Sequence, residues 1–217
     1  MSSATGNGIP FVTALVLGAG SSRRLGQPKQ LLEYRGRPLL QTAVDAAVGS
    51  CCQQVVVAIG GAAQEVRGAV DFDGCMVVEN VAFTAGCSSS IVAALGAVDA
   101  RSAGIVLCLG DQPGVSSEMV NRLVMEGSDS ELAVCRYRDG RGHPFWFSRA
   151  LFAALRGLRG DKAVWKLLES GLYQVLEVSF GQPIPSDVDT WDDYQQLLAG
   201  ESLTGESLTG ESLSRSA

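Results

Sequence analysis

The sequence predicts an α/β fold, in which a mostly parallel mixed sheet lies between two layers of helices. Short apolar runs rich in β-branched residues recur along the first half of the chain. Segments with apolar residues at three- and four-residue spacing separate these runs, which is the spacing of amphipathic helices. Continuous apolar strands are buried on both faces, so helices are expected on both sides of the sheet. The prediction is therefore a three-layer sandwich of the Rossmann-like type.

The first half of the chain is expected to form alternating strands and helices. The expected strands are residues 11–17, 55–59, 75–78 and 105–109. The expected helices are residues 38–48, 62–70 and 89–98. Ligands of such sheets bind beyond the carboxyl ends of the strands. The residues that follow Leu17 and Leu109 are therefore the first candidates for a functional site.

The last third of the chain has a different pattern, which predicts a mixed sheet. Residues 131–135 and 143–147 read as two strands around the turn RDGRG, and residues 173–178 alternate like a further strand. Residues 148–155 and 161–168 read as helices, and another helix is expected to begin near Thr190.

The domain organisation follows from these elements. Residues 1–10 are expected to be a flexible N-terminus, and residues 11–199 to form one domain. From Gly200 the sequence repeats GESLT, a unit too short to pack on itself. Residues 200–217 are accordingly expected to be a disordered low-complexity tail.

Composition excludes several classes of protein. The 217 residues carry a net charge of −6, which argues against a general nucleic-acid binder. The longest apolar run is six residues, Ala150 to Leu155, so no membrane segment is expected. The first ten residues do not resemble a secretory signal, and the six cysteines show no CxxC spacing. A reducing cytoplasm is the expected compartment.

A glycine-rich, basic loop follows the first expected strand. Its glycines allow a close approach of the backbone to a ligand, and its N–H groups together with Arg23, Arg24 and Lys29 can bind phosphate. Residues 18–37 hold five basic residues and one acid. A dinucleotide fingerprint would need glycine where Arg23 stands, and no Gly-Lys-Ser/Thr of a Walker loop is present. A tight turn with solvated arginines remains the alternative.

The stretch LVLGAGSSRRLGQPKQLL resembles the LxAGxSxRMGxxK signature of the MobA-like NTP transferase family, with Leu25 at the usual methionine. The segments NVAFTAG, GDQP, GHP and DVDTWDD follow in the family's order, so the resemblance spans about residues 11–198. It is greatest to the CTP:molybdopterin cytidylyltransferase branch. The implied fold is that of the nucleotide-diphospho-sugar transferases.

The resemblance implies a nucleotidyltransferase, in which an acceptor phosphate attacks the α-phosphorus of a nucleoside triphosphate and pyrophosphate leaves. Lys29, Arg23 and Asp111 are the implied catalytic residues. Mg²⁺ is the implied cofactor, with Asp111 and Asp189 as ligands, although Asp187 remains open as the second ligand. The implied nucleotide-binding residues are Leu17, Gly18, Ala19, Gly20, Ser21, Arg23, Arg24, Lys29, Asn80, Ser88, Ser89 and Asp111.

The resemblance also implies substrates. Ala19 and the GDQP segment favour CTP over GTP, and molybdopterin is the implied phosphorylated acceptor. His143, Pro144 and Gln112 are the implied acceptor-site residues. The family's GDxGxR segment is GDKAVW here, so Lys162 or Lys166 would have to replace its arginine.

Two alternatives accompany this hypothesis. The first is a nucleotidyltransferase that uses GTP or another triphosphate on a different small phosphate acceptor. The second is a non-catalytic nucleotide-binding partner of a molybdoenzyme. The expected partners are thus CTP or another triphosphate and a small phosphorylated acceptor, with no nucleic acid and no membrane. The chain itself is expected to be a monomer or to bind a molybdoenzyme transiently.

Overall fold

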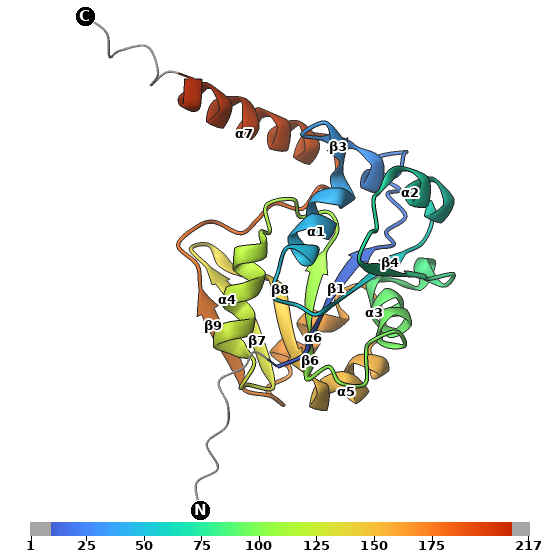
Figure 1. Cartoon of the computed structure of the whole chain (residues 1–217), viewed down its shortest axis with the longest axis vertical. Helices are drawn as coiled ribbons and strands as arrows, with labels where there is room; N and C mark the ends of the chain where they lie inside the picture. The colour runs from blue at the N-terminus through green and yellow to red at the C-terminus, as the bar shows by residue number, and fades with distance from the viewer. Residues whose placement is uncertain (1–9, 210–217) are drawn as a thin grey trace, which may run out of the picture.

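A seven-stranded sheet forms the centre of the computed structural model, which describes residues 10–209 (Figure 1). Its order is β5-β4-β1-β6-β8-β7-β9, and only β8 runs antiparallel to its neighbours. The strands are β1 (Val12–Gly18), β4 (Gln54–Ile59), β5 (Cys75–Glu79), β6 (Gly104–Leu109), β7 (Leu132–Tyr137), β8 (Gly140–Ser148) and β9 (Val175–Ser179). The predicted mostly parallel mixed sheet is therefore confirmed.

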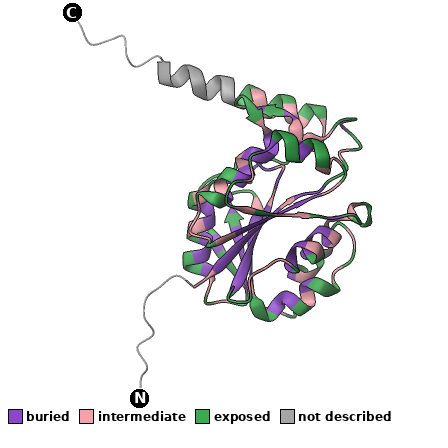
Figure 2. Cartoon of the chain, turned by 45° about the vertical axis from the view of Figure 1, so that its right-hand side comes forward, coloured by how far each residue is buried: buried purple, intermediate pink, exposed green. Residues whose placement is uncertain are grey.

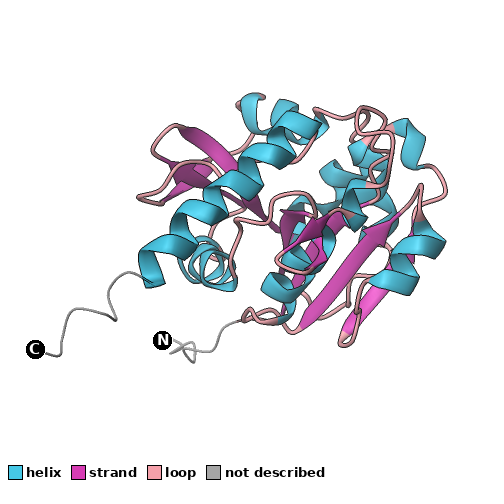
Figure 3. Cartoon of the chain, turned by 90° about the horizontal axis from the view of Figure 1, so that it is seen from above, coloured by secondary structure: helices cyan, strands magenta, loops and turns pink. Residues whose placement is uncertain are grey.

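Helices cover both faces of the sheet (Figure 3). They are α1 (Leu39–Val48), α2 (Ala63–Ala69), α3 (Cys87–Leu95), α4 (Ser117–Gly127), α5 (Phe152–Gly157), α6 (Ala163–Glu169) and α7 (Trp191–Thr209). Three 3₁₀ turns, η1 (Lys29–Leu31), η2 (Phe83–Ala85) and η3 (Arg149–Leu151), and a small hairpin of β2 (Glu33–Tyr34) and β3 (Arg37–Pro38) complete the described fold.

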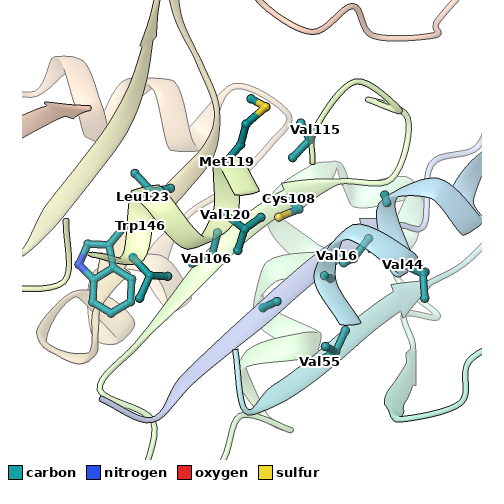
Figure 4. Packing of buried hydrophobic residues seen from close by; sticks show 14 of the residues in the cluster. Val16, Val44, Val55, Val106, Cys108, Val115, Met119, Val120, Leu123 and Trp146 are labelled. Atoms are coloured by element: carbon teal, nitrogen blue, oxygen red, sulfur yellow. The ribbon is translucent and has the colours of Figure 1, made fainter. Parts of the chain in front are cut away.

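Two hydrophobic cores fill the two spaces between the sheet and its helices. One core joins the sheet to α1, α2 and α4, through residues such as Val44 and Leu123 (Figure 4). The other joins the opposite face to α3, α5 and α6, through residues such as Ile91 and Leu155. Consecutive residues of β1 alternate between the cores, because successive side chains of a strand point to opposite faces. The central strands are consequently buried on both sides (Figure 2).

The structure adds elements that the sequence analysis did not assign. Helix α4 has an N-terminal cap, since Ser116 Oγ accepts a hydrogen bond from the Met119 N–H at 3.3 Å. The hairpin between β7 and β8 turns over Arg138 and Asp139 alone, so it is tighter than the expected RDGRG turn. The hairpin of β2 and β3 was also not predicted, because each strand has only two residues.

The C-terminal helix α7 extends beyond the expected end of the domain. It starts with a reciprocal cap, in which Thr190 N–H donates to Asp193 Oδ2 at 2.7 Å and Asp193 N–H to Thr190 Oγ1 at 3.2 Å. The helix continues through Gly200 to Thr209, whereas the tail was expected to lack structure from Gly200. Gly200 and Gly205 do not end the helix, although glycine has a low helix propensity. Residues 1–9 of the expected flexible N-terminus (1–10) and residues 210–217 of the expected tail lie outside the described residues.

Between residues 10 and 209, no helix is both long enough and apolar enough to cross a membrane. This includes α7, which is 19 residues long but begins with two acidic residues in its first turn. All six cysteines lie in this range and are free thiols.

Gly104, at the start of β6, lies against the ring of Trp146. A Cβ at this position would approach Trp146 Cη2 to 2.4 Å and Phe147 O to 2.5 Å. Gly104→Ala is therefore expected to destabilise the fold by about 3 kcal/mol, because backbone and a buried ring must both shift. Urea unfolding measures the effect.

The matched control is Gly68→Ala in α2, where an added Cβ would meet nothing within 4 Å. This exchange should stabilise the fold by about 0.5–1 kcal/mol. Equal unfolding midpoints for the two variants would contradict this account.

Candidate active site

A cleft of about 650 Å³ opens at the carboxyl ends of β1 and β6. Its walls come from five segments that are far apart in the sequence. They are residues 17–24 with 29–30, residues 83–84 and 86–87 with Ser90, residues 109–111, residues 161–162, and Asp187 with Asp189. The parallel register of β1 and β6 brings the first loop and Asp111 to the same edge of the sheet. Leu17, Leu109 and the residues that follow them line this cleft, which makes it the candidate for the expected site.

The loop after β1 presents a row of free backbone donors to the cleft. Residues 19–24 all line the cleft. In the described part of the chain, no hydrogen bond uses a backbone N–H of these six residues as its donor. The exposed guanidinium of Arg23 makes no ion pair with any described carboxylate. Free N–H groups beside a cation form a site that can bind phosphate oxygens.

Lys29 lies at the centre of the charges in the cleft. Its Nζ donates to Asp111 Oδ2 and, at 2.8 Å, to Asp189 Oδ1. Burial alone would lower the pKa of Lys29, but these two carboxylates outweigh it and raise the pKa of the ammonium group. Arg24 Nη2 donates to Asp189 Oδ2 at 2.7 Å. Burial opposes the charge of Asp189, yet Lys29 and Arg24 hold the pKa of this carboxyl below its usual value.

Asp187 differs from Asp189, although only one residue separates them. It lines the cleft and, in the part of the chain that the structure describes, has no ion-pair partner. Partial desolvation, together with the negative charges of Asp111 and Asp189, raises its pKa to about 6. Asp187 therefore brings to the cleft a carboxylate that forms no ion pair with the described residues, whereas Asp189 is already paired.

This raised pKa predicts a change of stability with pH. The folded state holds the Asp187 proton more tightly than the unfolded state, so this residue's stabilising contribution is complete below about pH 4 and is lost as the pH rises through about 6. Asp187→Asn removes that loss. The free energy of unfolding of the variant, measured by urea unfolding, should therefore increase relative to that of the wild type between pH 4 and pH 7. Asp129→Asn, outside the cleft, is the control. A difference that stays constant across this range would contradict the assigned pKa.

Three predicted nucleotide-binding residues lie behind the cleft wall. Asn80 is buried, and its Nδ2 donates to Ser89 Oγ at 2.8 Å and to Ser90 Oγ at 3.0 Å. Ser88 is also buried. Asn80, Ser88 and Ser89 do not line the cleft, whereas their neighbour Ser90 does. Asn80 thus shapes the turn before α3 and reaches the cleft only through other residues.

The three predicted acceptor-site residues are likewise outside the cleft lining. His143 stacks against Phe145 with ring centroids 4.0 Å apart, and burial lowers its pKa to about 3. Pro144 is buried beside it. The Gln112 Nε2 donates to Pro185 O at 3.1 Å. Because these three residues do not line the cleft, their direct contact with an acceptor stays a prediction.

The cleft also contains residues that the sequence analysis did not select. Asp161 Oδ1 accepts a hydrogen bond from the Cys87 N–H at 2.9 Å, at the start of α3. Lys162 lines the same wall, and Lys166 does not. Of the two lysines proposed to replace the missing arginine, Lys162 is therefore the one at the cleft. Gln30 lies under the first loop, and only its position after Lys29 could have signalled a role.

The fold and the loop at its edge define a nucleotidyltransferase. The model of the MobA-like NTP transferase domain matches residues 14–176, and the chain belongs to this family. The resemblance predicted from the motifs is confirmed.

Solved and curated relatives agree with this assignment of family. Rv0371c from Mycobacterium tuberculosis is 47% identical with a TM-score of 0.83, over 88% of this chain and 100% of that chain. A complex of Rv0371c with manganese is 46% identical with a TM-score of 0.80, over 87% and 98%. The nicotine blue oxidoreductase of Paenarthrobacter nicotinovorans is 30% identical over 88% of this chain and 98% of the relative. The purine catabolism protein PucB of Bacillus subtilis is 28% identical over 87% and 96%.

Proposed function

We propose that this nucleotidyltransferase transfers CMP from CTP to the phosphate of molybdopterin and releases pyrophosphate, with a divalent cation as cofactor. The observation that carries the proposal is the juxtaposition of the loop of free N–H groups with Lys29 and Asp111. A triphosphate needs such donors and positive charges on several oxygens at once. A divalent cation needs carboxylates at the same place.

The reaction forms a bond between an acceptor phosphate oxygen and the α-phosphorus, and breaks the bond from that phosphorus to the bridging oxygen of pyrophosphate. The residues of the chain contribute position and charge. The loop N–H groups and Arg23 hold the leaving phosphates, and Lys29 neutralises charge on the α-phosphate. An acceptor phosphate is ionised at neutral pH, so no general base is required of the chain. The neutral, buried His143 is compatible with this scheme.

The donor set in the cleft fits Mg²⁺ or Mn²⁺. Asp111 and Asp187 provide oxygen ligands, which are the ligands that these hard cations prefer. Among the described residues, no three His, Cys, Asp or Glu side chains already form a metal site. Substrate phosphates and water would have to complete the coordination shell, as is usual for Mg²⁺. When bound, the cation would supply charge neutralisation for the phosphates.

Asp187 is favoured over Asp189 as the second ligand. Asp187 has no ion-pair partner among the described residues, whereas both carboxylate oxygens of Asp189 bind Lys29 or Arg24. The manganese complex of Rv0371c supports a divalent cation.

The choice of base and acceptor rests on the motifs. Ala19 lines the cleft at the position where the cytidylyl branch has alanine, which supports CTP. Lys162, also in the cleft wall, can bind the acceptor phosphate in place of the family's arginine. GTP, or another triphosphate with a different small phosphate acceptor, is the alternative within the same reaction class. The free cysteines support a reducing compartment such as the cytoplasm.

Pyrophosphate release tests the proposal. The purified chain is incubated with each of the four ribonucleoside triphosphates, Mg²⁺ or Mn²⁺, and molybdopterin or a sugar phosphate. Pyrophosphate release with CTP and molybdopterin alone supports the proposal. Release with a different triphosphate and acceptor would change the proposed substrates but keep the proposed reaction class. Nucleotide binding without release in any pair favours a non-catalytic partner of a molybdoenzyme. Because one curated relative is named an oxidoreductase, oxidation of NADH or NADPH is measured as a separate arm.

A further inference from the structure

We infer that Gln30 is a positioning residue, which holds the loop after β1 in the shape that binds phosphate. This inference rests on the proposed function, in that the loop is taken to bind a triphosphate. Gln30 is only 4% exposed, although it is polar and lies beside the cleft. A buried amide of this kind must have partners, and its partners are in the loop itself.

The amide of Gln30 binds two carbonyls of the loop. Its Nε2 donates to Gly18 O at 2.7 Å and to Gly20 O at 2.9 Å. In a trans peptide the carbonyl and the N–H of the next residue point in opposite directions. Because the carbonyls of Gly18 and Gly20 face Gln30, the N–H groups of Ala19 and Ser21 face away from it. These are two of the free donors that line the cleft.

The same side chain couples the loop to Lys29. Ser22 Oγ donates to Gln30 Oε1 at 3.4 Å and accepts a hydrogen bond from the Lys29 N–H at 2.9 Å. Ser22 has φ of +50°, a left-handed conformation that a residue with a side chain seldom adopts. Gln30 and Ser22 thus join the loop to the backbone of Lys29, the residue whose ammonium group lies in the cleft.

The exchange of Gln30 for glutamate tests this role. Gln30→Glu keeps the shape, but its carboxylate cannot donate to the two carbonyls and is repelled by them. Binding of inorganic tripolyphosphate, measured by calorimetry at pH 7.5, is expected to weaken by at least about tenfold, because two hydrogen bonds that orient the donors are lost. At pH 5.5 protonation of the new carboxyl restores one donor, so part of the loss relative to wild type should be recovered. Gln30→Leu, which cannot be protonated, should show no recovery.

The matched control is Gln41→Glu. Gln41 is another buried glutamine, whose amide binds the Asp71 backbone through 3.0 Å and 2.7 Å hydrogen bonds away from the cleft. Its exchange should lower stability without changing tripolyphosphate binding. If Gln30→Glu does not fold, Ser22→Ala provides the test, because it removes the hydrogen bonds to Gln30 Oε1 and from the Lys29 N–H but leaves the two bonds from Gln30 Nε2 to the loop carbonyls, and it should weaken binding about threefold.

The outcomes separate this inference from the proposed function. Binding by Gln30→Glu within twofold of the wild type overturns the positioning role, and so does a wild type that does not bind tripolyphosphate. If the wild type binds tripolyphosphate and the Gln30→Glu variant loses this binding, the positioning role is retained. If the same wild type transfers no nucleotide to any acceptor, the proposed reaction is overturned. The recovery at low pH distinguishes orientation of donors from a general loss of packing.

Discussion

Replacement of Asp111 by asparagine is expected to lower kcat for nucleotidyl transfer by about 10²–10³, the usual effect of removing one charge that acts on the reacting phosphates. Asp111 follows β6 directly, lines the cleft and contacts Lys29. Asparagine preserves the size of the side chain but removes its charge. The ammonium group of Lys29 then loses one of its two carboxylate partners, and the cleft keeps one oxygen ligand fewer for a divalent cation. Initial rates of pyrophosphate release at saturating triphosphate measure the effect.

Asp45→Asn is the matched control for this variant. Asp45 lies on α1 and pairs with Arg37 outside the cleft, where both side chains are about half exposed. Exposed pairs of this kind contribute at most about 1 kcal/mol, so both the rate and the unfolding midpoint should stay near those of the wild type. A rate for Asp111→Asn within tenfold of the wild type would exclude Asp111 from the reaction.

Lys29→Met is expected to have two large effects. Without the ammonium group, kcat/KM for the triphosphate should fall by about 10³, because positive charge on the α-phosphate is lost. The fold should also lose roughly 3 kcal/mol at neutral pH, since Asp111 is left without its partner in a pair whose side chains are only 13% and 18% exposed. Asp111 and Asp189 then repel each other, because no ammonium group lies between them. Without Lys29 the pKa of Asp189, which Lys29 and Arg24 hold below its usual value in the wild type, should rise. The loss of stability should therefore diminish as the pH falls and the carboxyl of Asp189 becomes protonated.

Two measurements separate these effects. Urea unfolding at pH 7 and pH 4.5 gives the stability, and pyrophosphate release under conditions where the variant is fully folded gives the activity. Arg67→Met on α2 is the control, because its contact with Glu79 is 3.8 Å long and both side chains are about half exposed. A variant with full stability and near-wild-type kcat/KM would remove Lys29 from the centre of the site.

Local patterns were sufficient for most of the elements. The runs 11–17, 55–59 and 105–109 correspond to β1, β4 and β6, because each is a continuous apolar strand buried on both faces. Helix α4 was not predicted, although its apolar pairs Met119–Val120 and Leu123–Val124 have the four-residue spacing of an amphipathic helix and Ser116 caps its start. The tight β7–β8 turn depends on which residues pair across the hairpin, and pairing is a tertiary property.

The site was predictable to a similar degree. Glycines and basic residues after the first strand mark the loop that lines the cleft, and we expect this loop to bind phosphate, because the requirements for binding phosphate are local. His143 and Asn80 show the limit of this reasoning. Their family motifs are intact, yet His143 packs against Phe145 and Asn80 binds Ser89 and Ser90. A motif identifies the residue type, and the packing around it determines which atoms face the cleft.

The sequence by itself determined the α/β fold, the family and the position of the loop that follows β1, because these depend on residue periodicity and on short motifs. Only the tertiary structure decided which of the acidic side chains in the cleft are paired with cations. Asp189 is paired with Lys29 and Arg24, whereas Asp187 lines the same cleft without an ion-pair partner among the described residues and has a raised pKa. Likewise, only the fold turned the amide of Gln30 beneath the loop carbonyls. Charge pairing and hydrogen-bond direction depend on distances of a few ångströms between segments far apart in the chain, and a one-dimensional pattern does not contain those distances.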